Sequence, residues 1–128
     1  MRAPTLLVKD IAVHTPATAL ASETITTCAK RMHAEHVGCL IVVEKNDGSQ
    51  CPVGMVTDRD IAIEVVAFGL DPNALTAGDV MSEKPAVVEE DDDLLDVLAR
   101  MRERGARRLP VTRPDGALFA AVIGVWLL

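Results

Sequence analysis

The heptapeptide GMVTDRD at residues 54–60 places a hydroxyl and a carboxylate three residues apart, where a short apolar run meets a helical pattern. Thr57 stands where a helix N-cap would stand. In a capping box its oxygen accepts from a first-turn amide, and the Asp60 carboxylate accepts from the Thr57 amide. The same groups can bind a nucleotide, because helix amides attract phosphate, a carboxylate accepts from ribose hydroxyls and Gly54 leaves room for a close approach. Taken alone, so short a motif favours the cap.

The elements that would position this corner occur twice in the chain. Asp10 and Asp79 are 69 residues apart, and so are Pro16 and Pro85. The same offset pairs apolar residues along the chain: Ile25 with Leu94, Met32 with Met101, Leu40 with Leu109 and Val42 with Val111. An offset kept over this length indicates an internal repeat.

Each copy predicts a short strand, a helix and two strands joined by a turn. The strands before the helices lie at residues 17–20 and 86–88, and the hairpins begin at residues 38–43 and 109–112. The expected inward faces of the helices are Ile25, Cys28, Ala29 and Met32 in the first copy, and Leu94, Leu95, Leu98 and Met101 in the second. The first copy continues from the corner into a helix at residues 58–68, which gives the order β-α-β-β-α.

Composition excludes several classes of protein. The net charge of −6 opposes a general nucleic-acid or acidic-membrane binder, and no apolar run is long enough for a signal peptide or a membrane span. The three cysteines lack C-x-x-C spacing, which favours reduced thiols in a cytoplasm over disulfides or a zinc site. His33 and His36 have a spacing that suits a metal with Glu35 or His14, but surface histidines at a helix end explain them better. We find no catalytic motif, so we do not expect an enzyme.

The duplicated order of elements and three motifs resemble a tandem pair of cystathionine β-synthase (CBS) domains, a Bateman module. The motifs are G-h-h-T-x-x-D at residues 54–60, D-V-M at residues 79–81 and an R-x-L-P-V-like stretch at residues 107–111. The resemblance implies an α+β fold of two β-α-β-β-α repeats packed about a pseudo-twofold axis. We expect a first repeat with its lead-in at residues 1–75 and a second repeat at residues 76–128, together forming one compact module.

The resemblance also implies two clefts that bind AMP, ADP, ATP or S-adenosylmethionine. Thr57 would meet the phosphate or ribose and Asp60 the ribose hydroxyls, with Met55 and the backbone of Gly38 and Cys39 around adenine. The facing copy would add further residues, and some arginines would meet phosphate charge. The full expected ligand-binding set is Thr57, Asp60, Arg59, Met55, Gly54, Gly38, Cys39, Val80, Ala106, Arg107 and Arg108. For Arg107 and Arg108, a solvated pair at a helix end is the alternative.

The second copy departs from this pattern at its own corner. At an offset of 66, Ala120 stands at the position of Gly54, Ile123 at that of Thr57 and Trp126 at that of Asp60. An apolar corner cannot replace the hydration of ribose and phosphate, so we expect at most one nucleotide site per chain. The second copy also stops before a final helix. Its apolar last residues predict cover by another subunit or an exposed edge, and a truncated or altered terminus explains them equally well.

These observations favour a regulatory module without catalytic activity. It would bind an adenosine-containing ligand at its one intact cleft, require no cofactor, form a homodimer and signal by conformational change to an unidentified effector protein. The alternative is a ligand-free dimerisation or scaffold module with the same fold. An enzyme, or the regulatory fragment of one, is a third hypothesis, although two repeats in 128 residues leave no room for a catalytic domain.

Overall fold

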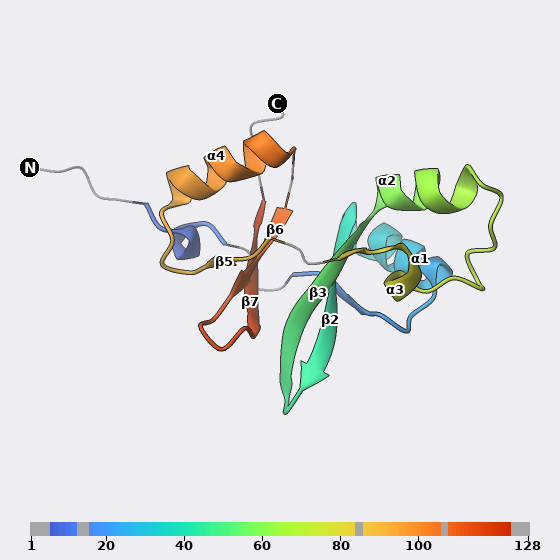
Figure 1. Ribbon diagram of the computed structural model, residues 1–128, viewed down its shortest axis with the longest axis horizontal. Helices are drawn as coiled ribbons and strands as arrows, with labels where there is room; N and C mark the ends of the chain where they lie inside the picture. Colours follow the sequence, from blue (N-terminus) through green and yellow to red (C-terminus); the bar gives the residue numbers. More distant parts are fainter. Residues whose placement is uncertain (1–5, 13–15, 84–85, 106–107, 124–128) are drawn as a thin grey trace, which may run out of the picture. The chain divides into compact units, whose positions relative to one another are not determined.

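The computed structural model describes residues 6–12, 16–83, 86–105 and 108–123 of the chain (Figure 1). The chain forms two compact units, which we name the central unit (Pro16–Pro85) and the terminal unit (residues 1–15 and 86–128). Each unit contains one copy of the repeat and its own sheet, and helices accompany each sheet. The mixed α+β class expected from the sequence is therefore confirmed.

The central unit is built on a four-stranded sheet of order β1-β2-β3-β4. Strand β1 pairs in parallel with β2, and the other two pairings are antiparallel. The helices of this unit lie on one side of its sheet (Figure 1). In chain order the elements are β1 (Thr18–Leu20), α1 (Ile25–Glu35), β2 (Cys39–Asn46), β3 (Ser49–Thr57), α2 (Asp58–Asp60), the π-helix η2 (Ile61–Val66), α3 (Ala77–Val80) and β4 (Ser82–Glu83).

The terminal unit repeats the first part of this arrangement with a three-stranded sheet of order β5-β6-β7. Its strand β5 pairs in parallel with β6, and β6 pairs with β7 in an antiparallel hairpin. The elements are the 3-10 helix η1 (Val8–Asp10), β5 (Val88–Glu89), α4 (Leu94–Arg104), β6 (Arg108–Thr112) and β7 (Leu118–Ile123).

The internal repeat holds at the level of individual strand pairs. Ala19 pairs with Val42 in the central unit, and their counterparts 69 residues later, Val88 and Val111, pair in the terminal unit. The bulge that follows Val42 also recurs after Val111. Helices α1 and α4 have the same length of 11 residues, and each has a polar N-cap side chain and a left-handed C-cap. The offset predicted from the sequence is thus a structural repeat.

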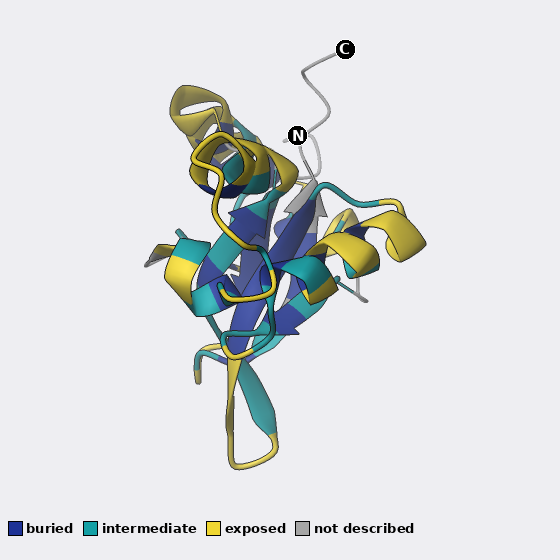
Figure 2. Cartoon of the chain, turned by 90° about the vertical axis from the view of Figure 1, so that its right-hand side faces the viewer, coloured by how far each residue is buried: buried dark blue, intermediate teal, exposed yellow. Residues whose placement is uncertain are grey.

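The two cores are built from equivalent positions. In the central unit, Cys28 and Met32 of α1 pack with Leu40 and Val42 of β2. In the terminal unit the counterparts of these residues pack together in the same way: Val97, Met101, Leu109 and Val111. Figure 2 shows that buried residues gather on the strands, whereas the outer faces of the helices are exposed. An apolar stripe on α1 therefore packs against β2, and an apolar stripe on α4 packs against β6.

The segment that precedes each repeat in sequence packs in the unit of the other repeat. Val8 of the lead-in is buried in the core of the terminal unit, and its amide donates to the Asp92 carbonyl at 3.0 Å. Its counterpart Ala77, which precedes the second repeat, is buried in the central unit and donates to the Glu23 carbonyl at 2.8 Å. Each repeat is therefore completed by the segment that lies before the other repeat in sequence.

Two details of the helices differ from the sequence expectation. Ala29 and Leu95 are exposed, and Val97 takes the inward place that Leu95 was expected to have. The helix expected at residues 58–68 starts as α2 but continues as the π-helix η2, in which the Ala67 amide donates to the Ala62 carbonyl at 2.9 Å.

In the described part of the chain, no helix combines the length and the apolar character that crossing a bilayer requires.

Candidate functional site

The corner predicted from the sequence lies at the end of β3. Thr57 is the last residue of β3 and the N-cap of α2. Its Oγ1 accepts from the Asp60 amide at 3.0 Å, and Asp60 Oδ2 accepts from the Thr57 amide at 3.0 Å. This reciprocal pair is the capping box that the spacing predicts. The box uses Oδ2 of the Asp60 carboxylate, so Oδ1 takes no part in the cap.

The start of β2 closes the other side of the corner. Cys39 pairs with Thr57 across the sheet and is buried. The Asp58 amide donates to the Gly38 carbonyl at 2.9 Å, and a side chain at Gly38 would bring its Cβ within 2.9 Å of Asp58 Oδ2. Gly38 and Cys39 therefore lie at the corner, and their contact with adenine stays a prediction. Arg59 is exposed, and its amide donates to Asp58 Oδ1 at 2.8 Å.

Gly54 has a different role from the one expected. It pairs with Glu83 of β4, and Met55 pairs with Ser82. A Cβ at Gly54 would lie 2.5 Å from Met81 Sδ and 2.7 Å from the Ser82 carbonyl oxygen. The absent side chain thus leaves room for the Met81 side chain and the Ser82 carbonyl, which fill the space beside Gly54.

A cavity of about 450 Å³ lies beside the corner within the central unit. Asp60 lines it from α2, and Val80 lines it from α3. Val80 was expected to come from the facing copy, but α3 belongs to the same unit as the corner. The complete lining is Asp60, Glu64, Leu70, Leu75, Asp79, Val80 and Ser82.

Sequence analysis missed a second aspartate, Asp79, that lines this cavity together with Asp60. Asp79 belongs to a second capping box, in which its Oδ2 accepts from the Thr76 amide at 2.9 Å. The signal was present, because Thr76-x-x-Asp79 repeats the pattern of Thr57-x-x-Asp60. Glu64 of η2 adds a third carboxylate to the lining. Within the described ranges, no group of three or more His, Cys, Asp or Glu side chains is arranged to hold a metal ion.

The remaining predicted residues come from the second repeat. Arg108 begins β6 in the terminal unit and is partly exposed. Ala106 and Arg107 lie outside the described residues, so their contribution to the site stays a prediction. The same holds for Trp126 and for the final residues of the chain.

The register of β7 confirms the alignment of the second corner. Ala120 pairs with Val111 as Gly54 pairs with Val42, and Ile123 pairs with Arg108 as Thr57 pairs with Cys39. Ile123 therefore occupies the position of Thr57 in the second repeat. It has no hydroxyl with which to cap a helix or to bind a ligand.

The chain is similar in sequence and in structure to proteins that are already known. Hypoxic response protein 1 of Mycobacterium tuberculosis is 37% identical to the chain over 89 residues, which are 70% of this chain and 60% of that protein. The chain spans 50 to 60% of the length of several curated relatives that it matches. A crystal structure of Hypoxic Response Protein I with two coordinated zinc ions has a TM-score of 0.80 at 31% identity and 92% coverage of both chains.

A second solved structure carries adenosine ligands. The CBS domain pair of protein MJ0100, in complex with 5′-methylthioadenosine and S-adenosyl-L-methionine, has a TM-score of 0.80 at 26% identity. The superposition covers 94% of this chain and 90% of that chain. The family model of the CBS domain matches residues 8–67 and again residues 77–125. The chain, with two copies of one fold and two matches to one family, belongs to the CBS-domain family.

Proposed function

We propose that the protein is a non-catalytic regulatory module that binds an adenosine-containing ligand at the Thr57/Asp60 corner. The observation that carries this proposal is that Asp60, whose Oδ1 is not used by the capping box, lines a cavity of about 450 Å³. Small-molecule sites in proteins commonly have volumes of about 300 to 1,000 Å³. A carboxylate at such a site can accept from the two hydroxyls of a ribose. The similar pair that binds 5′-methylthioadenosine and S-adenosylmethionine supports this ligand class.

The charges around the cavity favour some adenosine ligands over others. Its lining contains three carboxylates, those of Asp60, Glu64 and Asp79, and no Lys or Arg among the described residues. Carboxylates repel phosphate and attract the positive sulfonium of S-adenosylmethionine. Phosphate would need cations from elsewhere, such as Arg59 or the predicted Arg107 and Arg108. We therefore place S-adenosylmethionine and its neutral relatives before ATP, ADP and AMP.

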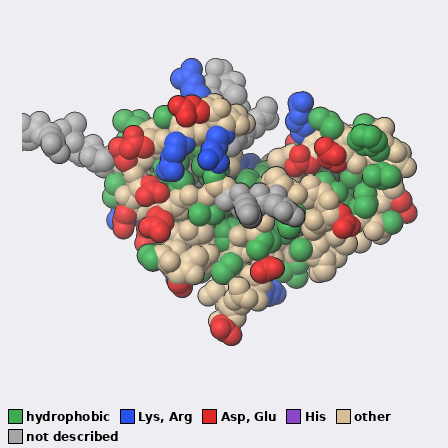
Figure 3. Space-filling model, viewed as in Figure 1, with side chains coloured by type: hydrophobic (Ala, Val, Ile, Leu, Met, Phe, Trp, Pro, Cys, Tyr) green, Lys and Arg blue, Asp and Glu red, His purple; other side chains and the backbone are tan. Residues whose placement is uncertain are grey.

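The module would signal by binding its ligand more tightly in one arrangement than in another, since only differential affinity shifts an equilibrium. The effector that reads the signal would be a separate protein. A second copy of the chain would bind at the apolar surface of η2 and the segment after it, where Figure 3 shows hydrophobic side chains gathered together. The exposed members of this η2 patch are Ile63, Val66, Phe68 and Leu70.

The alternative function is a ligand-free dimerisation module. The capping box favours it, because Thr57 and Asp60 already satisfy each other without a ligand. The η2 patch favours it too, since large exposed apolar surfaces mark interaction sites. The two functions differ in what the Asp60 carboxylate does beyond capping α2.

A thermal-shift titration with S-adenosylmethionine, 5′-methylthioadenosine, AMP, ADP and ATP separates the two functions. The Asp60→Ala variant should lose about 1 kcal/mol of stability through the cap. It should also lose the ligand-dependent rise in melting temperature that the wild type shows. The matched control is Asp10→Ala, because Asp10 Oδ2 accepts from the Leu7 amide at 2.8 Å and Asp10 does not belong to the cavity lining.

The control should lose stability but keep the ligand response. If no ligand raises the melting temperature of the wild type, the sensor function is refuted and the dimerisation module remains. If Asp60→Ala and Asp10→Ala respond to the ligand as strongly as the wild type, a ligand binds but not at this corner.

A further inference from the structure

One segment of the chain forms most of the wall of the cavity beside the corner. We name residues 70–83, which end with β4, the connecting segment. Five of the seven residues that line the cavity belong to it, and only Asp60 and Glu64 come from α2 and η2. After β4 the chain continues to β5 of the terminal unit, which begins at Val88. The connecting segment therefore links the cavity to the second repeat along the chain.

The connecting segment has little regular structure of its own. Its helix α3 has four residues and its strand β4 has two. A helix of one turn is not stable in isolation. Of residues 70–82, all of which the structure describes, Ala77 alone is buried. Segments with few buried apolar contacts open more readily than the core, so this segment keeps its place through its contacts with the rest of the central unit.

The connecting segment docks on residues 21–24, which we name the β1–α1 turn, and on the start of α1. Four backbone hydrogen bonds of 2.8 to 3.1 Å hold it there, from Ala77 to Glu23, from Gly78 to Ala21, from Ile25 to Leu75 and from Thr26 to Pro72. The last two donors are the first amides of α1, which a helix leaves without an intrahelical partner. The docked segment thus completes the N-terminus of α1 as well as the cavity wall.

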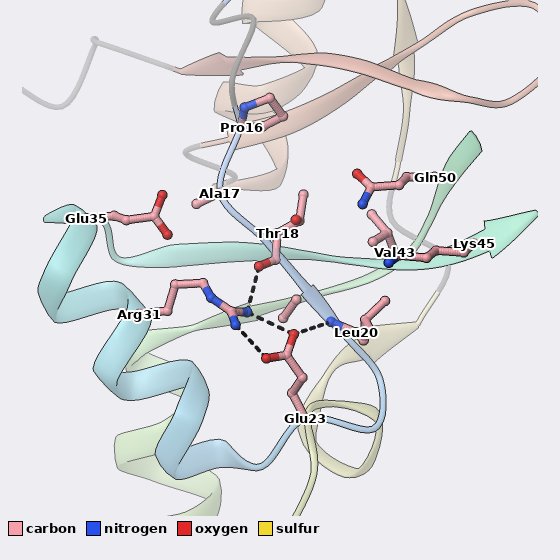
Figure 4. A pocket seen from close by; sticks show the side chains of 11 residues that line it. Pro16, Ala17, Thr18, Leu20, Glu23, Arg31, Glu35, Val43, Lys45 and Gln50 are labelled. Atoms are coloured by element: carbon pink, nitrogen blue, oxygen red, sulfur yellow. Dashed lines mark hydrogen bonds and ion pairs between the residues drawn. The ribbon is translucent and has the colours of Figure 1, made fainter. Parts of the chain in front are cut away.

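The β1–α1 turn is itself fixed by side chains. Glu23, whose carbonyl accepts from the segment, also accepts with its carboxylate from the Leu20 amide at 2.8 Å. Arg31 of α1 donates from both terminal nitrogens to this carboxylate, and from Nη1 to the Thr18 carbonyl at 2.9 Å (Figure 4). Because such a fork holds a carboxylate in one orientation, the turn is a rigid support on which the segment docks.

The repeat supplies a matched comparison in the terminal unit. There the lead-in docks on the equivalent turn, since the Val8 amide donates to the Asp92 carbonyl at 3.0 Å and the Lys9 amide to the Glu90 carbonyl at 3.0 Å. These bonds are the counterparts, 69 residues away, of the first two bonds of the connecting segment. No residue of the lead-in lines the cavity. The lead-in therefore has equivalent docking contacts without a ligand beside it.

We propose that a ligand in the cavity holds the connecting segment in its docked position, and that docking carries the occupancy of the cavity to the second repeat. This inference rests on the proposed function, because it requires a ligand that contacts both walls. Asp60 belongs to one wall, and Val80 and Ser82 belong to the other. When the segment undocks, the ligand loses the second wall. The docked state thus binds the ligand more tightly, and this differential affinity shifts the docking equilibrium.

The test is amide hydrogen exchange of the wild-type protein, measured by NMR with and without ligand. The probe is the compound among S-adenosylmethionine, 5′-methylthioadenosine, AMP, ADP and ATP that raises the melting temperature most. Without it, the amides of Ala77 and Gly78 should exchange faster than the Cys28 amide, which donates to the Thr24 carbonyl within α1 at 3.0 Å. At a ligand concentration of about 100 times Kd, the two segment amides should slow by up to about 100-fold.

The amides of Val8 and Lys9 are the matched controls and should keep their exchange rates. Equal slowing of the segment and the lead-in would overturn the inference, and so would unchanged segment amides in a protein whose melting temperature rises. Both results would leave the proposed function standing. Segment amides that exchange as slowly as Cys28 without ligand would also overturn the inference. If no compound raises the melting temperature, the proposed function fails and the inference fails with it.

A variant tests the support beneath the segment without touching the cavity lining. Arg31→Met removes the fork, so Ala77 should exchange several-fold faster than in the wild type. The control is Arg100→Met at the equivalent position, where Arg100 lies 3.9 Å from Asp92 and both side chains are more exposed. A folded Arg31→Met with the wild-type exchange rate at Ala77 would count against the inference. If circular dichroism shows that it is unfolded, Arg31→Lys takes its place, because one ammonium keeps the charge but cannot supply the fork.

Discussion

Replacing Gly54 by alanine tests whether the close approach of β4 holds the corner together. The new Cβ would lie 2.5 Å from Met81 Sδ and 2.7 Å from the Ser82 carbonyl oxygen. The Met81 side chain can rotate away, but the Ser82 carbonyl is part of the strand backbone. Strands β3 and β4 would have to separate, which weakens the pairing of Gly54 with Glu83 and of Met55 with Ser82.

The size of the effect follows from these contacts. Overpacking a buried site costs about 1 to 3 kcal/mol, and each hydrogen bond lost adds about 1 kcal/mol. We expect Gly54→Ala to lower the free energy of unfolding by about 2 to 4 kcal/mol. For a chain of this size the melting temperature should fall by roughly 8 to 15 °C. Because Ser82 lines the cavity, the variant should also respond more weakly to ligand.

The assay is chemical denaturation followed by circular dichroism, with Ala120→Gly as the control. Ala120 has the same register in the terminal unit and is fully buried. Its replacement removes a methyl group and adds backbone freedom, which should cost about 1 to 2 kcal/mol. If Gly54→Ala is as stable as the wild type, β4 does not restrict this position. The explanation of Gly54 as a packing glycine would then be refuted.

Two further predictions concern α1. His36, which ends α1 in the left-handed conformation at φ 56°, occupies the position that Gly105 has after α4. His36→Gly should therefore stabilise the protein by about 0.5 to 1 kcal/mol in thermal unfolding, and Gly105→His should destabilise it; a destabilised His36→Gly would contradict this reasoning. The hydrogen bond from Arg31 holds the pKa of Glu23 below its ordinary value of 4.5, so this carboxylate contributes stability above pH 4.5 that is lost as the pH falls through the lowered pKa. Denaturation at a series of acidic pH values should show a smaller loss of stability for Glu23→Gln than for the wild type, and equal slopes would argue against the ion pair.

Much of the fold could be predicted because the two copies of the repeat have apolar residues at equivalent positions. The offset found from Asp10 and Asp79 aligns the strand pairs and bulges of the two sheets. After the shorter turn of the second copy, an offset of 66 predicted that Ile123 stands at the position of Thr57, which the register confirms. Local spacing was sufficient for the capping box as well, because all its atoms come from four consecutive residues.

The parts that could not be predicted depend on contacts between distant segments. The role of Gly54 is set by Met81 and Ser82, which no local pattern links to it. Leu95 was expected to face inward because it is apolar, but the rotation of α4 is fixed by Val97 and Met101 in the core. The π-helix η2 has no recognisable signal in its sequence. Whether Arg107 and Arg108 reach the site stays a prediction for the same reason.

The exchange of the segments before the two repeats determines the order in which the chain can fold. The central unit is continuous in sequence, since α3 is supplied by the residues that follow it directly. The terminal unit contains both ends of the chain, and Val8 cannot donate to the Asp92 carbonyl until residues far along the sequence have been synthesised. Closing so long a loop carries an entropic cost that the central unit does not meet. During translation we therefore expect the central unit to form first, while the lead-in stays undocked until the second repeat has left the ribosome.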